Sequence, residues 1–225
     1  MSAARRLGFT LNELLIVVAI MVLVIALAVP AFNVITNSRS VDSAENQVST
    51  FLSGIRAEAI GLQEPRGAIF FEDIDTGRIT LAAIEFTPNQ AVPVIIDLSA
   101  GRDEMVLPNG VGWQSIPEGG GATAQDFPWT PFGVVMFDRD GNLLINSYRI
   151  VAAGGTKLWT RLQSLKDRNG GAVSVPYNGR STIGFAMFDK IAYDEQPAGN
   201  RDEWLKENAW PYLVNRYNGT LLKGQ

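Results

Sequence analysis

An uninterrupted apolar run near the N-terminus, from Leu14 to Phe32, constrains this chain more than any other feature of its sequence. The run contains no charged residue and has about the length that an α-helix needs to cross one bilayer. Arg5 and Arg6 precede it, and this positive charge predicts that the leading end stays cytoplasmic. The sequence therefore predicts one membrane helix, with the body of the protein on the far side of the membrane.

Three interpretations of this run compete. A secretory signal peptide would place its cleavage site at Ala26–Ala28, but Pro30 just beyond the cut and Glu13 at the start of the run disfavour it. A plain signal anchor without processing is the second interpretation. The third depends on the residues around Gly8, and it explains more of the sequence than the other two.

The segment Arg5–Leu15 reads RRLGFTLNELL and resembles the prepilin peptidase site of type IV pilins and pseudopilins. The resemblance implies cleavage after Gly8, a methylated N-terminus at Phe9, and a glutamate at the fifth mature position, which is Glu13. Pro30 occupies the twenty-second mature position, where the family often carries proline. The match is specific, and it covers roughly the first quarter of the chain.

The carboxylate of Glu13 has a physical explanation within this resemblance. A charged residue in a membrane helix costs up to ~3 kcal/mol on insertion scales if it is central. Cleavage after Gly8 would create a partner cation, the α-amino group of Phe9. Pairing within one helix is possible because i and i+4 groups are adjacent, whereas the family implies pairing between neighbouring subunits, which sets axial register. A third alternative is that Glu13 simply extends to the membrane interface.

Beyond the run, apolar residues recur at spacings of three and four and predict an amphipathic helix that Pro65 terminates. We expect this stripe to pack on the protein's own sheet. It comprises Val41, Ala44, Val48, Phe51, Leu52, Ile55, Ala59 and Leu62. Pro30 and the polar residues after Phe32 mark a place for a kink or local melting.

The remaining sequence predicts mainly strands and turns. We expect three hairpins, which pair 68–71 with 78–86, 134–137 with 143–151, and 212–216 with 220–223. We also expect further strands at 92–98 and 181–188 and a short helix at 201–208. The predicted fold class is α+β, in which a long N-terminal helix, membrane anchor plus amphipathic half, packs on a mainly antiparallel, pilin-like β-sheet head. The predicted segments are a leader peptide at 1–8, a transmembrane and filament-core helix at 9–32, an amphipathic helix at 33–64 that continues into the head, and a β-rich globular head at 65–225.

Composition narrows the chemistry. The chain has neither Cys nor His, which excludes thiolate chemistry, Ser-His-Asp catalysis and most zinc sites. A net charge of −4 without a basic run argues against nucleic-acid binding. Asp138, Asp140 and Asn142 place oxygens at alternate positions, but Gly141 comes too early for an EF-hand, and a polar turn is the preferred interpretation. We expect no catalytic residues, no metal site and no cofactor.

Two shorter matches refine the expected function. Phe137 with Gly141, and the segment Arg56–Ile60, resemble parts of the H-type minor pseudopilins of type II secretion, although the segment 157–208 has no counterpart there. The resemblance implies a structural subunit, a minor pseudopilin, of a type II secretion pseudopilus or a type IV pilus. Its implied partners are the inner membrane, a prepilin peptidase and other pilin or pseudopilin subunits, with a single-pass location in the inner membrane and the head on the periplasmic or extracytoplasmic side. The alternative is a membrane-anchored ligand-binding module, such as an adhesin or a DNA-uptake minor pilin.

Overall fold

A computed structural model describes much of the chain. The described residues are 11–73, 75–86, 94–117, 132–151, 157–162 and 177–224, without the side chains of 27–39, 157, 159 and 161. The chain forms two compact units, residues 1–39 and residues 40–225. Helix α1 (Leu11–Leu62) contributes residues to both units.

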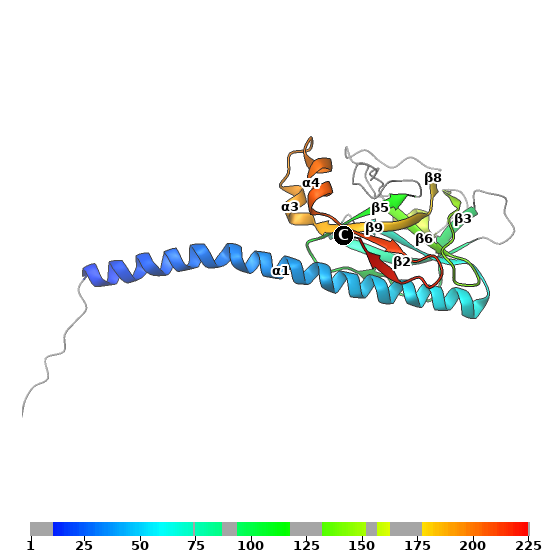
Figure 1. Ribbon diagram of the computed structural model, residues 1–225, viewed down its shortest axis with the longest axis horizontal. Coiled ribbons are helices and arrows are strands. Elements are labelled where there is room, and N and C mark those ends of the chain that lie inside the picture. The colour runs from blue at the N-terminus through cyan, green and yellow to red at the C-terminus, as the bar shows by residue number, and fades with distance from the viewer. Residues whose placement is uncertain are drawn as a thin grey trace, which may run out of the picture. The chain divides into compact units, whose positions relative to one another are not determined.

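The described residues of the second unit form two β-sheets and three further helices (Figure 1). The first sheet has the order β6-β1-β2-β3-β7-β8, with β4 also paired to β2, and the second has the order β11-β10-β9-β5. The strands are β1 (Arg66–Glu72), β2 (Ile79–Phe86), β3 (Val94–Leu98), β4 (Met105–Val106), β5 (Val111–Pro117), β6 (Phe132–Phe137), β7 (Ser147–Ile150), β8 (Tyr177–Arg180), β9 (Thr182–Asp189), β10 (Trp210–Val214) and β11 (Leu221–Lys223). The helices are α2 (Lys157–Leu162), α3 (Lys190–Asp194) and α4 (Arg201–Asn208).

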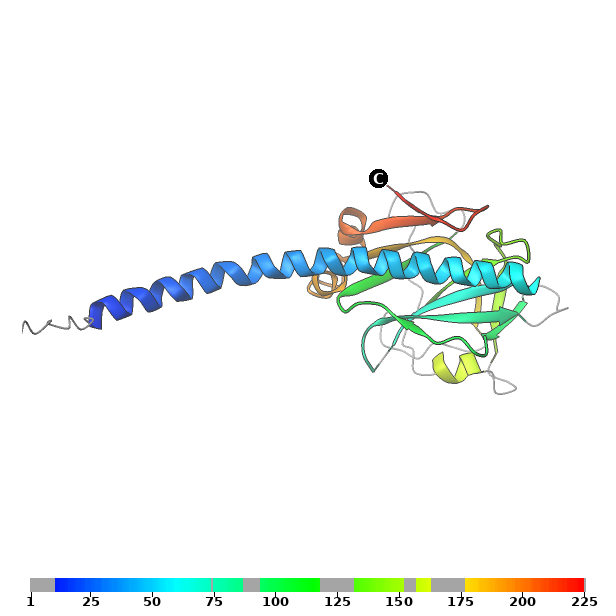
Figure 2. The same cartoon turned by 90° about the horizontal axis from the view of Figure 1, so that it is seen from below.

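Residues 41–59 of α1 lie along the two sheets and close the main core (Figure 2). Every residue of the predicted stripe is buried except Leu62, which is 54% exposed. The exception has a local cause, since α1 ends at Leu62 and Gln63 takes a φ of 55°, in the left-handed region. The predicted packing of the stripe on the protein's own sheet is therefore confirmed for residues 41–59.

The first sheet is buried on both faces. Ala68 and Phe70 of β1 face the core beneath α1, while the alternate residues Ile69 and Phe71 belong to a second apolar cluster. Leu158 and Leu162 of α2 join this second cluster. A strand buried on both faces reads as continuously apolar, which is the pattern of β1.

Two of the predicted hairpins are confirmed, and the third forms only next to its turn. β1 pairs antiparallel with β2, and β10 with β11. Strand β6 instead pairs with β1, and its contact with the following segment is an isolated bridge from Phe137 to Leu143. The N–H of Leu144 still donates to the carbonyl oxygen of Met136 at 2.8 Å. Beyond that point the chain leaves β6, since β7 pairs with β3 and β8.

The predicted fold class needs correction. Most strand pairs among the described residues are antiparallel, as predicted, but β3 and β7 run parallel and the short helices α2, α3 and α4 add to the sheets. The fold is therefore mixed α/β rather than the predicted α+β fold with a pilin-like head. Parallel neighbours require a long crossover, here the chain through β4 to β6, and such pairing leaves no local signal in the sequence.

Among the described residues, no helix is both long and apolar enough to cross a membrane. This finding contradicts the membrane-anchor half of the long N-terminal helix in the predicted fold. It equally contradicts the predicted single-pass location in the inner membrane with the head on the periplasmic or extracytoplasmic side.

Candidate functional site

Glu13, the predicted assembly residue, lies in the first turn of α1 and is exposed. The N-terminal end of a helix carries partial positive charge from its unpaired N–H groups, which favours a carboxylate there. This local effect gives the acid a favourable position before any partner is considered. Gly8 and Phe9, the predicted processing residues, lie outside the described residues.

Pro30, the other residue expected to serve assembly, belongs to α1, and its side chain lies outside the described set. The helix runs continuously through this position and through the polar residues that follow it. Of the two alternatives predicted here, a kink or local melting, melting is therefore wrong for the described backbone.

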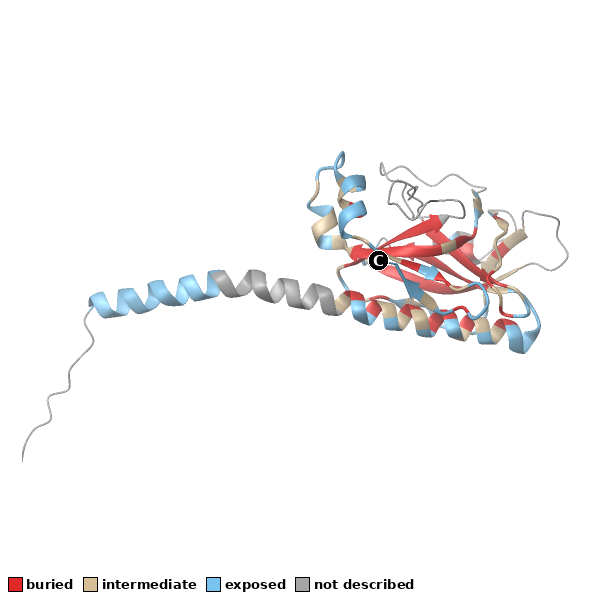
Figure 3. Cartoon of the chain, in the orientation of Figure 1, coloured by how far each residue is buried: buried red, intermediate tan, exposed pale blue. Residues whose placement is uncertain are grey.

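Apolar side chains cover the part of α1 that begins at Leu11. Leu11 itself is 83% exposed, and the large aliphatic residues that follow are between 44% and 61% exposed. They are Leu14, Leu15, Ile16, Val17, Val18, Ile20, Met21, Val22, Leu23, Val24 and Ile25. Consecutive positions point to all sides of a helix, so this surface is apolar all round. Figure 3 shows its exposure as unbroken pale blue along residues 11–26.

The helix segment Arg56–Ile60 and the turn at 138–142, which the sequence analysis singled out separately, contact each other. Arg56 of α1 donates from Nε to the carbonyl oxygen of Gly141 at 2.7 Å. Its Nη2 donates to the carbonyl oxygen of Tyr217 at 3.2 Å. One guanidinium therefore holds the turn at 138–142 and the turn at 215–219 against the same helix. The sequence analysis identified the helix segment and the first turn but not their contact.

Gly141 fits this arrangement for two reasons. Its φ of +79° lies in the left-handed region, where a side chain is strained. A Cβ at this position would also lie 2.6 Å from Cδ1 of Ile60 and 3.1 Å from Nε of Arg56. The close approach of turn and helix thus depends on the missing side chain.

The acidic turns serve the backbone rather than a metal. Oδ1 of Asp138 accepts hydrogen bonds from the backbone N–H groups of Asp140 at 3.0 Å and Asn142 at 2.8 Å. Asp73 accepts from the N–H groups of Asp75 and Thr76 in the same way. These are Asx turns, in which the carboxylate caps its own loop. Within the described part of the chain, no group of three or more acidic side chains is placed to hold a metal ion.

Tyr212 links β10 to the start of the buried stripe. Its hydroxyl donates to Oε2 of Glu45 at 2.8 Å, and Nζ of Lys223 lies 3.7 Å from the same oxygen. Burial raises the pKa of Tyr212 well above its ordinary value, and the Glu45 carboxylate raises it further. Burial also raises the pKa of Tyr148 and Tyr177. These phenols stay protonated near neutral pH, which suits structural hydrogen bonds rather than acid–base catalysis.

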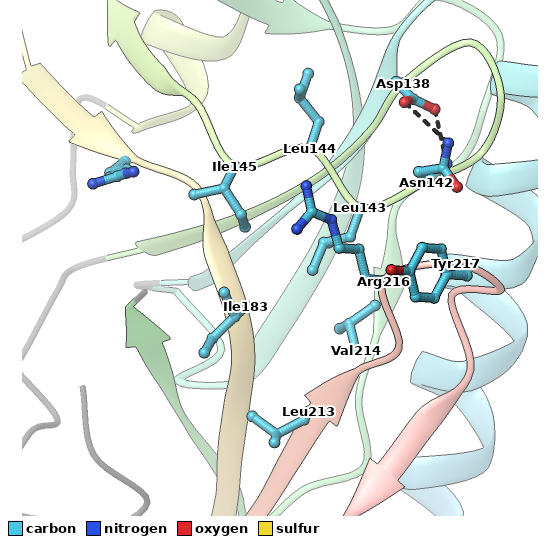
Figure 4. A pocket seen from close by; sticks show the side chains of 11 residues that line it. Asp138, Asn142, Leu143, Leu144, Ile145, Ile183, Leu213, Val214, Arg216 and Tyr217 are labelled. Carbon is cyan, nitrogen blue, oxygen red and sulfur yellow. Dashed lines mark hydrogen bonds between the residues drawn. The ribbon is translucent and has the colours of Figure 1, made fainter. Parts of the chain in front are cut away.

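A cleft of about 760 Å³ opens beside the clamped turns (Figure 4). The pairing of β10 with β9 ends at Leu213 opposite Gly184, and the two strands separate beyond that point. The cleft is lined by Asp138, Asn142, Leu143, Leu144, Ile145, Arg180, Ile183, Leu213, Val214, Arg216 and Tyr217. The sequence analysis missed this site, because its walls come from three segments whose proximity depends on the sheet topology.

Comparisons with protein-family models, with curated proteins and with solved structures each gave no match for this chain. Functional inference therefore depends on the residues and their geometry.

Proposed function

We propose that this chain is a structural, non-enzymatic subunit of a pilin-like filament, either a type II secretion pseudopilus or a type IV pilus. In this proposal a prepilin peptidase cleaves between Gly8 and Phe9, and the subunit enters the filament through the N-terminal part of α1. The order of Gly8, Phe9, Glu13 and Pro30 in the sequence supports the processing step.

The observation that carries the proposal is the apolar surface exposed all round residues 11–25. Burial of apolar surface stabilises a structure by roughly 25 cal/mol per Å². A helix that is apolar on every side gains most from neighbours on every side, rather than from one sheet. Parallel copies of the same kind of helix in a filament core supply such neighbours.

Glu13 gives that assembly its register. In an apolar environment an unpaired carboxylate is destabilising, and a cation nearby offsets the cost. Processing would free the α-amino group of Phe9 for this purpose. An amine from one subunit meeting Glu13 of the next fixes their axial offset, which nonspecific apolar contact does not.

The test combines mass spectrometry with filament fractionation in cells that contain a prepilin peptidase. We expect the mature wild-type chain to begin at Phe9 and Gly8→Val to remain uncleaved. Glu13→Ala should be processed normally but fall by at least about tenfold in the sheared filament fraction, as loss of about 1.4 kcal/mol implies. Asp42→Ala, which removes an exposed acid from the second unit, is the matched control and should assemble normally.

Two results would overturn parts of the proposal. A mature terminus at Val29 would show that the N-terminus is a secretory signal. Normal incorporation of fully processed Glu13→Ala would remove the registering role of the carboxylate.

A further inference from the structure

Three Asn-Gly pairs lie among the described residues, and they differ in the contacts of their reactive groups. Asparagine before glycine is open to an intramolecular reaction, because glycine has no Cβ to obstruct the approach to its nitrogen. In this reaction the glycine nitrogen attacks the side-chain carbonyl carbon of the asparagine. The pairs are Asn109 with Gly110, Asn178 with Gly179 and Asn218 with Gly219. The contacts of the nitrogen and the side-chain amide therefore decide which pair can react in the folded chain.

At Asn109 the two reacting groups already contact each other. The N–H of Gly110 donates to Oδ1 of Asn109 at 3.0 Å, so the side-chain carbonyl group lies against the nitrogen that would attack it. Both residues lie in the turn before β5, and Asn109 is exposed, which gives water access. Rotation about χ2, a soft torsion in asparagine, can turn the carbonyl carbon toward the nitrogen.

At Asn218 the same groups are bonded elsewhere. The N–H of Gly219 donates to the backbone carbonyl oxygen of Asn215 at 2.9 Å. Oδ1 of Asn218 accepts from the N–H of Thr220 at 3.1 Å and from its hydroxyl at 2.8 Å. A Cβ at Gly219 would lie 2.8 Å from Cδ of Arg56, so the backbone has little room to move. Attack at this pair would require these hydrogen bonds to break first.

At Asn178 strand pairing holds the backbone. Asn178 and Gly179 lie in β8, opposite Arg149 and Tyr148 of β7. A Cβ at Gly179 would lie 2.5 Å from Cζ of Tyr148, so the ring of this tyrosine packs directly on the glycine. Closing a ring between Asn178 and Gly179 would pull this segment out of the sheet and would cost hydrogen bonds of the ladder.

We propose that Asn109 is a site of spontaneous deamidation, at which the folded chain forms aspartyl and isoaspartyl residues with water as the co-reactant. The Gly110 nitrogen loses its proton to solvent and bonds to Cγ of Asn109. The bond from Cγ to Nδ2 breaks, and Nδ2 takes up a proton from water and leaves as ammonia. Water then opens the cyclic succinimide at Cγ, which gives the aspartyl product, or at the backbone carbonyl carbon, which gives the isoaspartyl product. Nothing is oxidised or reduced.

The modification changes the junction between β5 and α3. The carbonyl oxygen of Gly110 accepts from the N–H of Lys190, the first residue of α3, at 2.8 Å. An isoaspartyl link adds a backbone carbon immediately before Gly110, and either product adds a negative charge to a chain whose net charge is −4. The fraction of acidic molecules therefore rises with the age of the protein. The proposal goes beyond the filament role and does not depend on it.

The test incubates the purified full-length chain, kept soluble by a mild detergent, in mildly alkaline buffer and samples it over time. Pepsin digestion at acidic pH, where succinimide formation is slow, precedes chromatography and mass spectrometry that resolve asparaginyl, aspartyl and isoaspartyl peptides. We expect Asn109 to convert at least about fivefold faster than Asn178 or Asn218, as breaking one hydrogen bond worth ~1 kcal/mol at the slower sites implies. Isoaspartyl peptide should accompany the aspartyl peptide, because only the ring produces it.

Two comparisons identify the cause. In guanidinium chloride the three sites should convert at similar rates, because unfolding removes the contacts that distinguish them. Asn109→Gln should abolish the acidic species that isoelectric focusing shows after ageing of the folded chain, because the longer side chain closes a less favourable ring. Asn218→Gln is the matched control, since it changes the same group in another exposed turn, and the acidic species should persist.

Each opposite result contradicts the proposal. Equal rates at the three sites of the folded chain, or faster conversion at Asn178 or Asn218, would mean that the contact of Gly110 with Asn109 does not select the site. Absence of conversion at Asn109 while the unfolded chain converts would mean that the fold protects it. Aspartyl product without isoaspartyl product would exclude the ring.

Discussion

Two stretches of α1, residues 11–26 and residues 41–59, are both rich in large aliphatic side chains and differ completely in their exposure (Figure 3). In the first stretch the apolar residues follow one another and cover every side of the helix. In the second they recur at spacings of three and four, and the chain's own sheets bury them. The spacing of apolar residues, more than their number, decides whether one sheet can cover a helix.

Because their exposure differs, we expect the two stretches of α1 to have different roles, one in stability and the other in assembly. The second stretch belongs to the core of residues 40–225 and contributes to the stability of that unit. The first stretch contributes little to the fold of the single chain and is available for the assembly proposed above. Predictions that separate stability from assembly therefore test the comparison directly.

The largest effect is expected at Leu52, which is fully buried against the main core. Leu52→Ala should lower the free energy of unfolding by about 2–5 kcal/mol, through lost burial and the cavity that remains. Leu23→Ala is the matched control, because Leu23 is 61% exposed, and we expect a change within about 0.5 kcal/mol. Urea unfolding monitored by tryptophan fluorescence measures both. If the two variants lose the same stability, the contrast between the stretches is wrong.

The buried stripe was predictable because helical spacing is a local property of the sequence. The prediction that its last member, Leu62, is buried was wrong, because periodicity does not reveal that Gln63 leaves the helix. The β1–β2 and β10–β11 hairpins were predictable for a similar reason, since both combine apolar runs with a turn containing Asn or Asp and Gly. The strand after Leu143 was misplaced, because its partner β3 is distant in sequence.

In the candidate sites, too, local features were predictable from the sequence and contacts between distant segments were not. Sequence motifs singled out Arg56 and Gly141 separately, and only the fold shows that the guanidinium bonds that carbonyl. Nothing local marked Arg216 or Leu213 as lining a cleft, because the cleft exists where two strands separate. A site formed by side chains of one helix can be predicted from the sequence. A site formed by loop carbonyl groups and diverging strands cannot, because its parts are distant in sequence.

An intermediate effect is expected where α1 meets the 138–142 turn. Gly141→Ala places a Cβ against Ile60 and Arg56 at a positive φ, so we expect a loss of about 2–3 kcal/mol. Gly77→Ala is the matched control, because Gly77 also has a positive φ but a Cβ there meets nothing within 4 Å. Its loss should be about 1–2 kcal/mol, from backbone strain alone. Equal losses in thermal or urea unfolding would mean that the turn does not press against the helix.

The smallest effect is expected at Tyr212, whose hydroxyl bonds Glu45 near the start of the buried stripe. Tyr212→Phe should cost about 1 kcal/mol at neutral pH, the typical net value of one hydrogen bond. The more diagnostic readout is the dependence of stability on pH. Folding raises the pKa of Tyr212 above its ordinary value, by burial and then by the Glu45 carboxylate. The unfolded chain therefore loses this proton first as the pH rises.

The contribution is consequently complete below about pH 10, the ordinary pKa of tyrosine, and is lost as the pH rises above it. Each proton released only from the unfolded state lowers stability by about 1.4 kcal/mol per pH unit. Urea unfolding between pH 7 and about pH 11 should show a steeper loss for the wild type than for Tyr212→Phe. Some slope should remain in the variant, because Tyr148 and Tyr177 also have raised pKa values. Parallel curves for the two proteins would mean that Tyr212 ionises alike in both states, and that its bond to Glu45 does not hold β10 against the buried half of α1.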